Sequence, residues 1–271
     1  EKMIKTILMG AGGRMGGRIG HLITAATDME VSAAVEATGH PAVGKDLGEV
    51  LGMAMTGILV ADDLKKVVKE GDVVIDFTYH ESSLRHLEIA AKVGKPIVIG
   101  TTGFTPNELK TAAKLAKKTP CVIAPNMSVG VNVMFKVLEN VAAILGDDYD
   151  VEILEAHHKL KKDAPSGTAM KMAQIIAAKL GRNLDRDGVY ARKGMIGERT
   201  KAEIGIQTLR GGDIVGEHNV MFVTNGERLE FIHRAHNRDN FARGALRAAK
   251  WIVNQQKGLY DMQDVLGLKT R

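Results

Sequence analysis

The feature that most constrains the fold is a regular alternation of short apolar runs with amphipathic segments over the first half of the sequence. The apolar runs are rich in β-branched residues and the other segments have helical spacing, which is typical of a parallel sheet with crossover helices. The predicted strands are Ile4–Met9, Val31–Val35, Val73–Phe77, Ile97–Ile99 and Val122–Ala124. The predicted helices are Gly13–Ala26, Leu64–Lys69, Ser82–Val93 and Asn107–Lys118, the last opened by Thr105-Pro106 as N-cap and first turn. We therefore predict a doubly wound α/β domain.

A second pattern begins after Asn126, where two helices are followed by long strand-like runs joined by tight turns. An Asn-Gly pair between two alternating runs, at Asn225-Gly226, is a strong hairpin signal. The predicted elements are helix Val129–Leu145, strand Val151–Ala156, helix Thr168–Leu180 with Gly181 as its C-cap, and strands Ile204–Leu209, Asn219–Val223 and Arg228–His233. The pattern predicts an antiparallel or mixed sheet, and then a closing helix, Phe241–Gln255, that returns to pack on the first domain.

The length of 271 residues and the change of pattern together indicate two domains. Residues 1–127, completed by residues 239–271, are expected to form the Rossmann-type doubly wound sheet. Residues 128–238 are expected to form a central α+β domain with a mixed sheet. Within the first domain, Gly39–Gly57 is expected to be an irregular excursion rather than a regular helix, because glycines and a proline interrupt it.

A glycine-rich loop, "GAGGRMG", follows the first predicted strand and opens the first helix. Glycines in this context allow a tight turn and let backbone N–H groups approach a pyrophosphate at the helix N-terminus. Glu36 ends the second strand, where a carboxylate would bind ribose hydroxyls. The expected dinucleotide contacts here are Gly10, Ala11, Gly12, Gly13, Arg14, Met15 and Glu36. The alternative is that the glycines serve only close helix–sheet packing and that Glu36 is a solvated strand end.

Three further strand ends carry small, hydroxyl or amide residues at the carboxyl edge, where open α/β sheets bind ligands. Each of them taken singly also fits a simple turn. The residues expected to contact the cofactor there are Phe77 and Thr78; Gly100, Thr101 and Thr102; and Ala124, Pro125, Asn126 and Met127.

The segment "EAHHKLKKDAPSGTA" in the second domain contains two adjacent histidines, three lysines and a Pro-Ser-Gly-Thr turn, all residue types that can act in catalysis or binding. Adjacent histidines, His157 and His158, project in opposite directions on a strand, and no third ligand has zinc spacing, so we expect no metal. The Pro-Ser-Gly-Thr turn opens a helix, whose free N–H groups, hydroxyls and neighbouring cations can receive a carboxylate. The alternative is a histidine that caps a sheet edge, followed by solvated lysines.

This segment resembles the signature of the dihydrodipicolinate reductase family, also called 4-hydroxy-tetrahydrodipicolinate reductase, Glu-x-His-His-x-x-Lys-x-Asp-x-Pro-Ser-Gly-Thr. Every fixed position is filled, and "GAGGRMG", "DFT", "GTTGF", "NMSVGVN", "GERTKAEIGIQTLRGGDIVGEH" and "FARGALRAAKW" fall in the family's order over essentially the full chain. The resemblance implies NADH- or NADPH-dependent reduction of 4-hydroxy-tetrahydrodipicolinate to tetrahydrodipicolinate on the diaminopimelate route to lysine. It also implies a homotetramer assembled through the sheet of the central domain.

By motif position, the resemblance implies a role for each residue of the segment. His157 is the implied general acid/base and Lys161 the implied proton donor. His158 is the implied substrate contact, and the turn of Ser166, Gly167 and Thr168 is the implied carboxylate site. These roles suit the chemistry, because hydride delivery to a conjugated imine requires a proton source while two carboxylates are held still.

The sequence departs from the family's pattern at one position that bears on the cofactor. Many members that favour NADPH carry an arginine directly after the acidic residue, whereas this chain has Ala37 after Glu36. Arg14 is the alternative source of that positive charge. We expect NADH or both cofactors to be used.

The amino-acid composition argues against several other classes of protein. The net charge is +5, but aromatic residues make up only 4% of the chain and no basic run is interleaved with them, so we expect no nucleic-acid partner. We also expect no membrane span and a cytoplasmic location, the latter because the single cysteine, Cys121, excludes an internal disulfide. Cys121 lies in an apolar strand and is expected to be unreactive, which argues against a semialdehyde dehydrogenase. A nicotinamide-sensing module without chemistry would keep the glycine loop but would not need the histidine and lysine segment.

Overall fold

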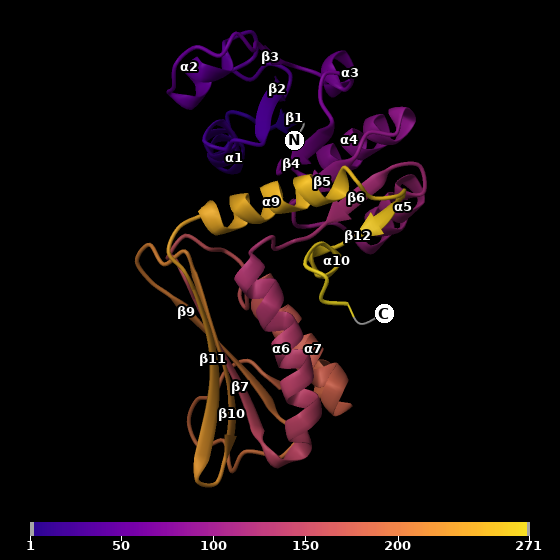
Figure 1. The fold of residues 1–271 in the computed structure, drawn as a ribbon. Helices are drawn as coiled ribbons and strands as arrows, with labels where there is room; N and C mark the ends of the chain where they lie inside the picture. Colours follow the sequence, from indigo (N-terminus) through magenta and orange to yellow (C-terminus); the bar gives the residue numbers. More distant parts are fainter. Residues whose placement is uncertain (1–2, 270–271) are drawn as a thin grey trace. The chain divides into compact units, whose positions relative to one another are not determined.

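A computed structural model describes residues 3–269, and their contacts divide the chain into two compact units. The first unit comprises the chain up to Val129 together with the segment that begins at Arg238. The second unit is Gly130–Asn237. Figure 1 shows the C-terminal segment (yellow) beside strands of the first half of the chain, which is the predicted return of the closing helix.

The first unit contains a parallel sheet that has seven strands among the described residues. Their spatial order is β12-β6-β5-β4-β1-β2-β3. The strands are β1 (Ile4–Met9), β2 (Met29–Val35), β3 (Val60–Ala61), β4 (Val73–Asp76), β5 (Ile97–Ile99), β6 (Pro120–Ile123) and β12 (Gly258–Tyr260). The strand order reverses between β1 and β4, which makes the carboxyl end of β1 the switch point where doubly wound folds bind ligands. The predicted Rossmann-type sheet is confirmed.

Helices cover both faces of this sheet, so its central strands are apolar on both sides. Leu8 and Ile75 pack in one core with α1 and α9, whereas Ile7 and Val74 pack in the core beneath α4 and α5. The helices are α1 (Arg14–Thr24), α2 (Leu47–Leu51), α3 (Leu64–Val67), α4 (His80–Val93), α5 (Pro106–Ala116), α9 (Asp239–Ile252) and α10 (Met262–Val265).

One local signal in the first unit acts as the sequence predicts, and one close contact was not predicted. Thr105 caps α5 in a reciprocal capping box with Glu108, and Pro106 is in the first turn. Helix α9 packs against the chain at Met127, because a Cβ at Gly244 would lie only 1.7 Å from the Met127 carbonyl oxygen. A glycine there is what allows the close approach.

The second unit contains a mixed sheet, as predicted, with the order β11-β10-β7-β9-β8 over the described residues. Strand β10 is antiparallel to both β11 and β7, whereas β7, β9 and β8 are parallel. The elements are β7 (Asp150–His157), β8 (Gly188–Val189), β9 (Ile204–Arg210), β10 (Gly216–Thr224), β11 (Glu227–Ala235), α6 (Val129–Leu145), η1 (Gly146–Asp148), α7 (Gly167–Leu180) and α8 (Leu184–Asp187).

Helices α6 and α7 lie on the same face of this sheet (Figure 1). Along β7, Val151 and Ile153 point into the core that these helices cover, and Glu155 and His157 follow on the same face because side chains alternate. The opposite face carries exposed apolar side chains, among them Leu154. The register of β7 therefore places two ionisable groups in a buried position at the end of an apolar row.

One expectation needs a refinement. Gly39–Gly57 is mostly irregular, but the short helix α2 forms inside it, where Asp46 caps the helix by accepting from the Gly48 amide and Gly52 ends it at φ 67°. Val129–Asp148, which is mainly α6, is long and apolar enough by length and composition to cross a membrane, with 20 residues and a mean hydropathy of 1.5. One face of α6 packs in the core of the second unit through Val131, Met134, Leu138 and Ala142, whereas Val133 and Ile144 are exposed.

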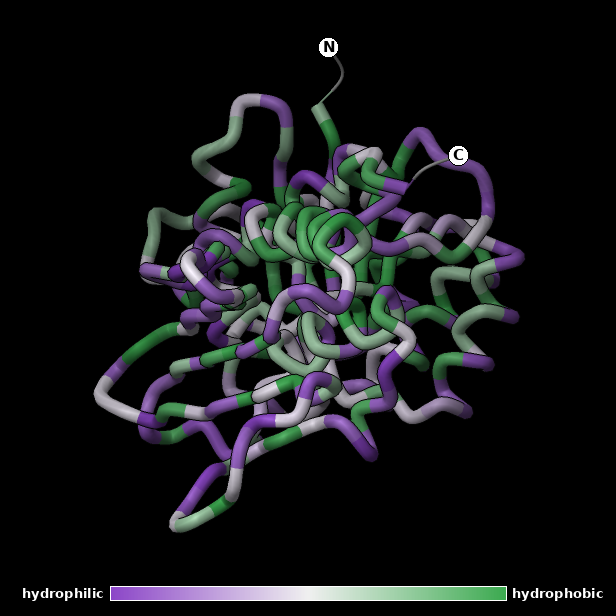
Figure 2. Tube along the Cα trace, turned by 90° about the horizontal axis from the view of Figure 1, so that it is seen from below, coloured by the Kyte–Doolittle hydropathy of each residue, from purple (hydrophilic) through white to green (hydrophobic). Residues whose placement is uncertain are grey.

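The strands β3, β8 and β12 were not predicted. Strands β3 and β8 have only two residues each, and β12 (Gly-Leu-Tyr) lacks the β-branched residues that mark the equally short β5. They pair at or near the sheet edges, where a neighbouring strand supplies their hydrogen bonds. In Figure 2 hydrophobic (green) and hydrophilic (purple) residues alternate along much of the trace, in keeping with helices and strands that have one buried and one solvated face.

Candidate active site

The glycine loop joins β1 to α1 at the switch point of the parallel sheet. Gly10 adopts φ 67°, and a Cβ at Gly16 would lie 2.0 Å from the Gly10 carbonyl oxygen. The helix therefore begins almost in contact with the loop, which only glycine allows. No side chain caps α1 at Gly13, and no acidic residue lies in its first turn. The helix start is thus free to receive an anion.

Glu36 faces this loop from the end of β2. Its Oε2 accepts from the Gly12 amide at 2.9 Å, and its Oε1 accepts from the Ala37 amide at 2.9 Å. The imidazole of His40 lies over Gly12, because a Cβ at Gly12 would lie 2.7 Å from the His40 Cε1. His40 was not predicted at this site, since it lies in the stretch expected to be irregular and no motif marks it. Arg14 and Ala37 are both exposed.

The ends of β4 and β5 lie next to each other in the sheet, and their predicted residues meet. The Phe77 ring packs on Gly100, where a Cβ would lie 2.2 Å from the ring carbons. Thr101 is buried and its hydroxyl bonds the Ser83 hydroxyl at 2.8 Å, while the Thr78 hydroxyl lies 3.3 Å from the same Ser83 oxygen. Thr102 is exposed on the loop that follows β5.

The buried carboxylate of Asp76, at the end of β4, accepts hydrogen bonds from the residues around it. Asp76, which has no exposed surface, accepts from the Thr78 amide at 2.8 Å and from the Thr78 hydroxyl at 2.7 Å. Its other oxygen lies 2.7 Å from Nδ1 of His86 on α4. In the sequence Asp76 stands out only as part of the "DFT" motif, and nothing local marks His86, because its pairing with Asp76 depends on α4 packing beside β4.

The end of β6 supplies the last predicted cofactor residues. Ala124 and Met127 are buried, whereas Pro125 is exposed. The Asn126 side-chain oxygen accepts from the Ser128 amide at 2.9 Å, which closes a tight turn. The residues predicted to bind the cofactor thus lie together in the first unit, on loops that follow β1, β2, β4, β5 and β6.

In the second unit, His157 is the last residue of β7 and is almost fully buried. Its Nδ1 lies 2.5 Å from Oε2 of Glu155, two residues earlier on the same face of the strand. Burial lowers the pKa of His157, and the bond to Glu155 opposes that effect.

Glu155 itself is completely buried and collects donors from several elements. Arg210 on β9 reaches both of its oxygens at 2.8 Å, and the Ser166 amide donates at 3.0 Å. Burial raises the pKa of Glu155, but the bonds from Arg210, His157 and Ser166 outweigh burial and lower its pKa to about 2. Glu155 is therefore a carboxylate at any working pH. The motif contained this residue, but its role depends on Arg210, which lies 55 residues later in the chain.

The amino end of α7 forms the predicted turn. Ser166 caps the helix by accepting from the Ala169 amide at 3.2 Å, and its hydroxyl lies 3.1 Å from Nε2 of His218 on β10. Gly167 is exposed and Thr168 is half-buried, and the first turn carries no acidic residue. The exposed first turn suits a carboxylate ligand.

Lys161 and His158 lie on the loop between β7 and α7. The Lys161 amide donates to the His158 carbonyl at 3.0 Å, and Lys161 Nζ pairs with the exposed Asp163 at 2.9 Å. The Asp163 carbonyl in turn accepts from Arg210 at 2.6 Å, which ties this loop to Glu155. Nδ1 of His158 is buried and has no hydrogen-bond partner among residues 3–269.

His218 is a further histidine that the sequence did not single out. Its ring lies edge-on to that of His157, with centroids 5.3 Å apart. Burial, together with the nearby charge of His157, lowers the pKa of His218 to about 3, so this ring is neutral. Over the part of the chain that the structure describes, no group of three or more ligating side chains could hold a metal ion.

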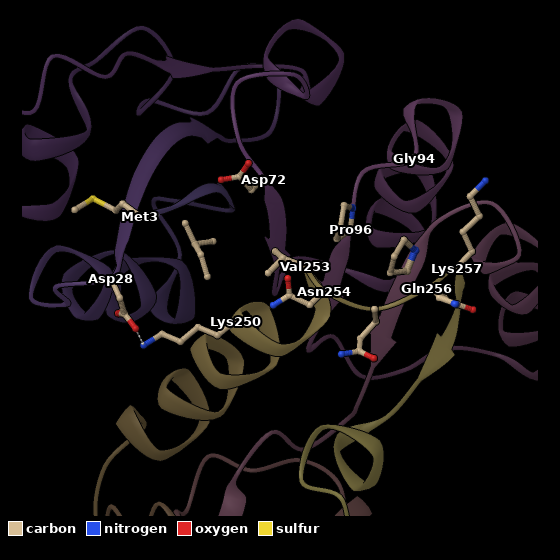
Figure 3. Close-up of a pocket in the computed structure, with 13 residues that line it drawn as sticks. Met3, Asp28, Asp72, Gly94, Pro96, Lys250, Val253, Asn254, Gln256 and Lys257 are labelled. Carbon is tan, nitrogen blue, oxygen red and sulfur yellow. Dashed lines mark ion pairs between the residues drawn. The ribbon is translucent and has the colours of Figure 1, made fainter. Parts of the chain in front are cut away.

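A large depression of about 1140 Å³ lies elsewhere, at the amino ends of the parallel strands (Figure 3). Ile4, Pro96 and Pro120 at the strand starts line it, and an ion pair between Asp28 and Lys250 at 2.5 Å spans one side. The glycine loop is at the carboxyl end of the same sheet. This depression, although large, is therefore at the opposite end of the sheet from the site where doubly wound folds bind ligands.

Known protein families match both halves of the chain. Residues 4–127 match the model of the dihydrodipicolinate reductase N-terminus, and residues 130–266 match that of its C-terminus. A protein of Syntrophus aciditrophicus named 4-hydroxy-tetrahydrodipicolinate reductase is 62% identical over 99% of this chain and 100% of its own length. One of the same name from Citrifermentans bemidjiense is 57% identical over 98% of this chain and 100% of its own length.

Solved structures with a similar fold include a member of the same family. A dipicolinate-bound dihydrodipicolinate reductase from Paenisporosarcina sp. TG-14 has a TM-score of 0.77 at 27% identity, with 97% of this chain and 98% of that chain covered. An amine dehydrogenase from Mycobacterium smegmatis shares the fold, with a TM-score of 0.62 at 14% identity over 99% of this chain and 97% of that one. The chain belongs to the dihydrodipicolinate reductase family.

Proposed function

We propose that this protein reduces 4-hydroxy-tetrahydrodipicolinate to tetrahydrodipicolinate with a reduced nicotinamide cofactor, in the synthesis of diaminopimelate and lysine. The names of its relatives support this activity. The observation that carries the proposal is the group in the second unit, where a buried carboxylate holds His157 close to Lys161 and to a helix start free of acidic residues. That combination supplies a proton and receives an acidic substrate.

The nicotinamide cofactor supplies a hydride when bound, and the glycine loop has the form that such a cofactor needs. Side chains at Gly12 and Gly16 would fill the space beside the loop, so the backbone is open to a pyrophosphate. The start of α1 would hold the phosphates and Glu36 a ribose diol. The predicted residues after β4, β5 and β6 would bind the rest of the cofactor: Phe77, Thr78, Gly100, Thr101, Thr102, Ala124, Pro125, Asn126 and Met127.

We propose that the protein uses NADH at least as well as NADPH. The Glu36 carboxylate faces the loop and would repel a 2′-phosphate, and Ala37 beside it has no charge to offer. Arg14 is exposed at the start of α1 and is the alternative partner for that phosphate. His40 also lies against the loop, beside Gly12.

In the chemical step, His157 and Lys161 provide the proton that follows the hydride. Nδ1 of His157 faces Glu155, which leaves Nε2 to exchange protons. Lys161 keeps the site cationic for a dianionic substrate. Ser166, Gly167 and Thr168 hold one carboxylate at the start of α7. His158, whose buried Nδ1 has no partner in the described part of the chain, contacts the substrate.

We also propose a cytoplasmic homotetramer that assembles through the second unit. The face of its mixed sheet opposite α6 and α7 exposes Leu154, Leu209 and Ile232, at 40%, 46% and 46%. Neighbouring strands bring apolar side chains together on a sheet face, and such a face is favourable to bury against another copy. Light scattering at micromolar concentration tests this, and a monomer there contradicts it.

A coupled assay tests the activity. The unstable substrate is generated in place by a synthase, and loss of the absorbance of the reduced nicotinamide is followed after this protein is added. We expect turnover that requires both substrate and protein, and that is lost in His157→Gln. Cofactor binding without turnover would indicate a nicotinamide-sensing module instead.

A further inference from the structure

We propose that Glu155 is a positioning residue that fixes the tautomer of His157 and ties the imidazole to the amino end of α7. The inference rests on the proposed function, in which His157 is the general acid/base and the start of α7 receives a substrate carboxylate. It adds a residue that contacts neither substrate nor cofactor and acts through its neighbours.

Glu155 has no capacity left for a substrate. A carboxylate has about four acceptor positions, and five donors surround this one. They are Nδ1 of His157 at 2.5 Å, the Ser166 amide at 3.0 Å, the Thr208 hydroxyl at 3.1 Å and two Arg210 nitrogens at 2.8 Å. The side chain has no exposed surface. Its influence therefore passes through the groups that it binds.

The bond to His157 has a direct chemical consequence. An ionised carboxylate only accepts hydrogen bonds, so Nδ1 of His157 carries the hydrogen in the neutral ring. The Nε2 atom is then the position that gains or loses the catalytic proton. Without this bond either nitrogen can carry the hydrogen, and a fraction of the protein has the wrong tautomer. In a serine protease, the comparable loss of an orienting carboxylate lowers kcat about 10⁴-fold.

Several charged or titratable groups face His157, and Glu155 is the negative one among them. Lys161 and Arg210 both act to lower the pKa of the imidazole, and the neutral ring of His218 packs edge-on against it. Burial acts in the same direction. Glu155 is therefore the group that raises the pKa of His157 against the effects of burial, Lys161 and Arg210.

The same carboxylate also holds the helix start. Oε1 of Glu155 accepts from the Ser166 amide, while Oε2 binds the His157 ring. Ser166 is the N-cap of α7, so the imidazole of His157 and the proposed carboxylate turn share one buried anchor. A disturbance at Glu155 is thus expected to change proton transfer and substrate binding together, and to leave the cofactor loop of the first unit unchanged.

The first experiment uses the wild-type protein without any turnover. Nitrogen-15 NMR of histidine-labelled protein, assigned with His157→Gln, reports the tautomer and the titration of His157. We expect the neutral ring to carry its hydrogen on Nδ1. A neutral ring protonated mainly on Nε2 overturns the proposal whether or not any variant folds.

The second experiment compares Glu155→Gln with a matched control, Thr208→Val, which removes a neutral donor to the same carboxylate but leaves its charge. We expect Glu155→Gln to lower the His157 pKa by about 1 to 3 units, the usual effect of an adjacent opposite charge. We expect kcat to fall about 10²-fold or more and the limb of the pH profile to move to lower pH, while the KM for NADH stays constant. Thr208→Val should leave the pKa and the profile near wild type.

The outcomes separate the two proposals. A His157 pKa and a pH profile that are unchanged in Glu155→Gln overturn the positioning role. A shifted His157 pKa in a protein that does not reduce the dicarboxylate supports the positioning role and contradicts the proposed function. Loss of activity in Glu155→Gln with an unchanged His157 pKa, or an equal pKa shift in Thr208→Val, means that Glu155 is merely structural and overturns the proposal.

Discussion

A single methyl group at Gly16 is expected to damage cofactor binding, because the start of α1 almost touches the glycine loop. A Cβ at Gly16 would lie 2.0 Å from the carbonyl oxygen of Gly10 and 2.7 Å from its carbonyl carbon. Ordinary contacts of a Cβ begin at 3.4 Å, so the oxygen and the helix must separate by more than 1 Å. Both atoms at the clash belong to the backbone, and neither can rotate away as a side chain would. The whole start of α1 has to move.

This movement displaces the amides that are proposed to hold the pyrophosphate. A 1 Å misplacement of binding groups can cost about 10²-fold in rate, and overpacking typically costs about 1 to 3 kcal/mol in stability. For Gly16→Ala we therefore expect affinity for NADH to fall at least about tenfold, together with a lower melting temperature.

The matched control is Gly17→Ala, one residue further along the same helix. Its Cβ would meet nothing closer than 3.9 Å, so only the helix propensity changes. That change favours alanine by roughly 0.5–1 kcal/mol. Fluorescence titration with NADH and thermal unfolding measure both variants. If Gly16→Ala binds NADH as tightly as Gly17→Ala does, the assignment of this loop to the pyrophosphate is wrong.

Four other predictions address the chemistry and the core. His157→Gln should lower kcat about 10²-fold or more without unfolding the protein, since general acid–base groups contribute 10²–10⁴; circular dichroism with turnover assays checks this, and wild-type-like kcat would remove His157 from the mechanism. Because the folded pKa of Glu155 is lowered from 4.5 to about 2, the stability it adds is present above pH about 4.5 and is lost as the pH falls towards about 2; unfolding in denaturant across this range should show a smaller pH dependence in Glu155→Gln, and equal slopes would argue against it. Ala37→Arg should raise affinity for NADPH by about one to two decades through a charge-assisted contact of roughly 1.5–3 kcal/mol; kcat/KM for both cofactors checks this, and a strong native NADPH preference that the change leaves unaltered would point to Arg14. Burial raises the pKa of the Cys121 thiol, so a thiol reagent should label it only on unfolding, whereas rapid labelling of the folded protein is the contrary result.

The parts of the site that depend on residues close together in the chain could be predicted from the sequence. The role of the glycines after β1 could be predicted from the sequence. They lie between a strand and a helix that follows it directly, and such a turn leaves no room for side chains. The capping pair Thr105 and Glu108 and the end of α7 at Gly181 are also local, since each depends on residues within one helical turn. The segment from Glu155 to Thr168 was recognisable because the motif residues are close together in the chain.

The partners of those residues were not predictable, because they come from distant segments. Arg210 reaches Glu155 only because β9 pairs with β7 in parallel register, with His157 opposite Arg210. His218 reaches Ser166 because β10 pairs with the other edge of β7. Pairing registers depend on the whole sheet, and a single sequence carries little information about them.

The same division applies to the first unit. The sequence by itself determined the alternating strands and helices, the glycine loop and the carboxylate at Glu36, because hydrophobic period and glycine geometry act over a few residues. Only the tertiary structure decided that His40 lies over Gly12, that His86 pairs with Asp76, and that β12 extends the sheet. These contacts exist because packing brings together segments whose own sequences have no preference for one another, and their free energy appears only once the cores beneath α1, α4 and α9 have formed.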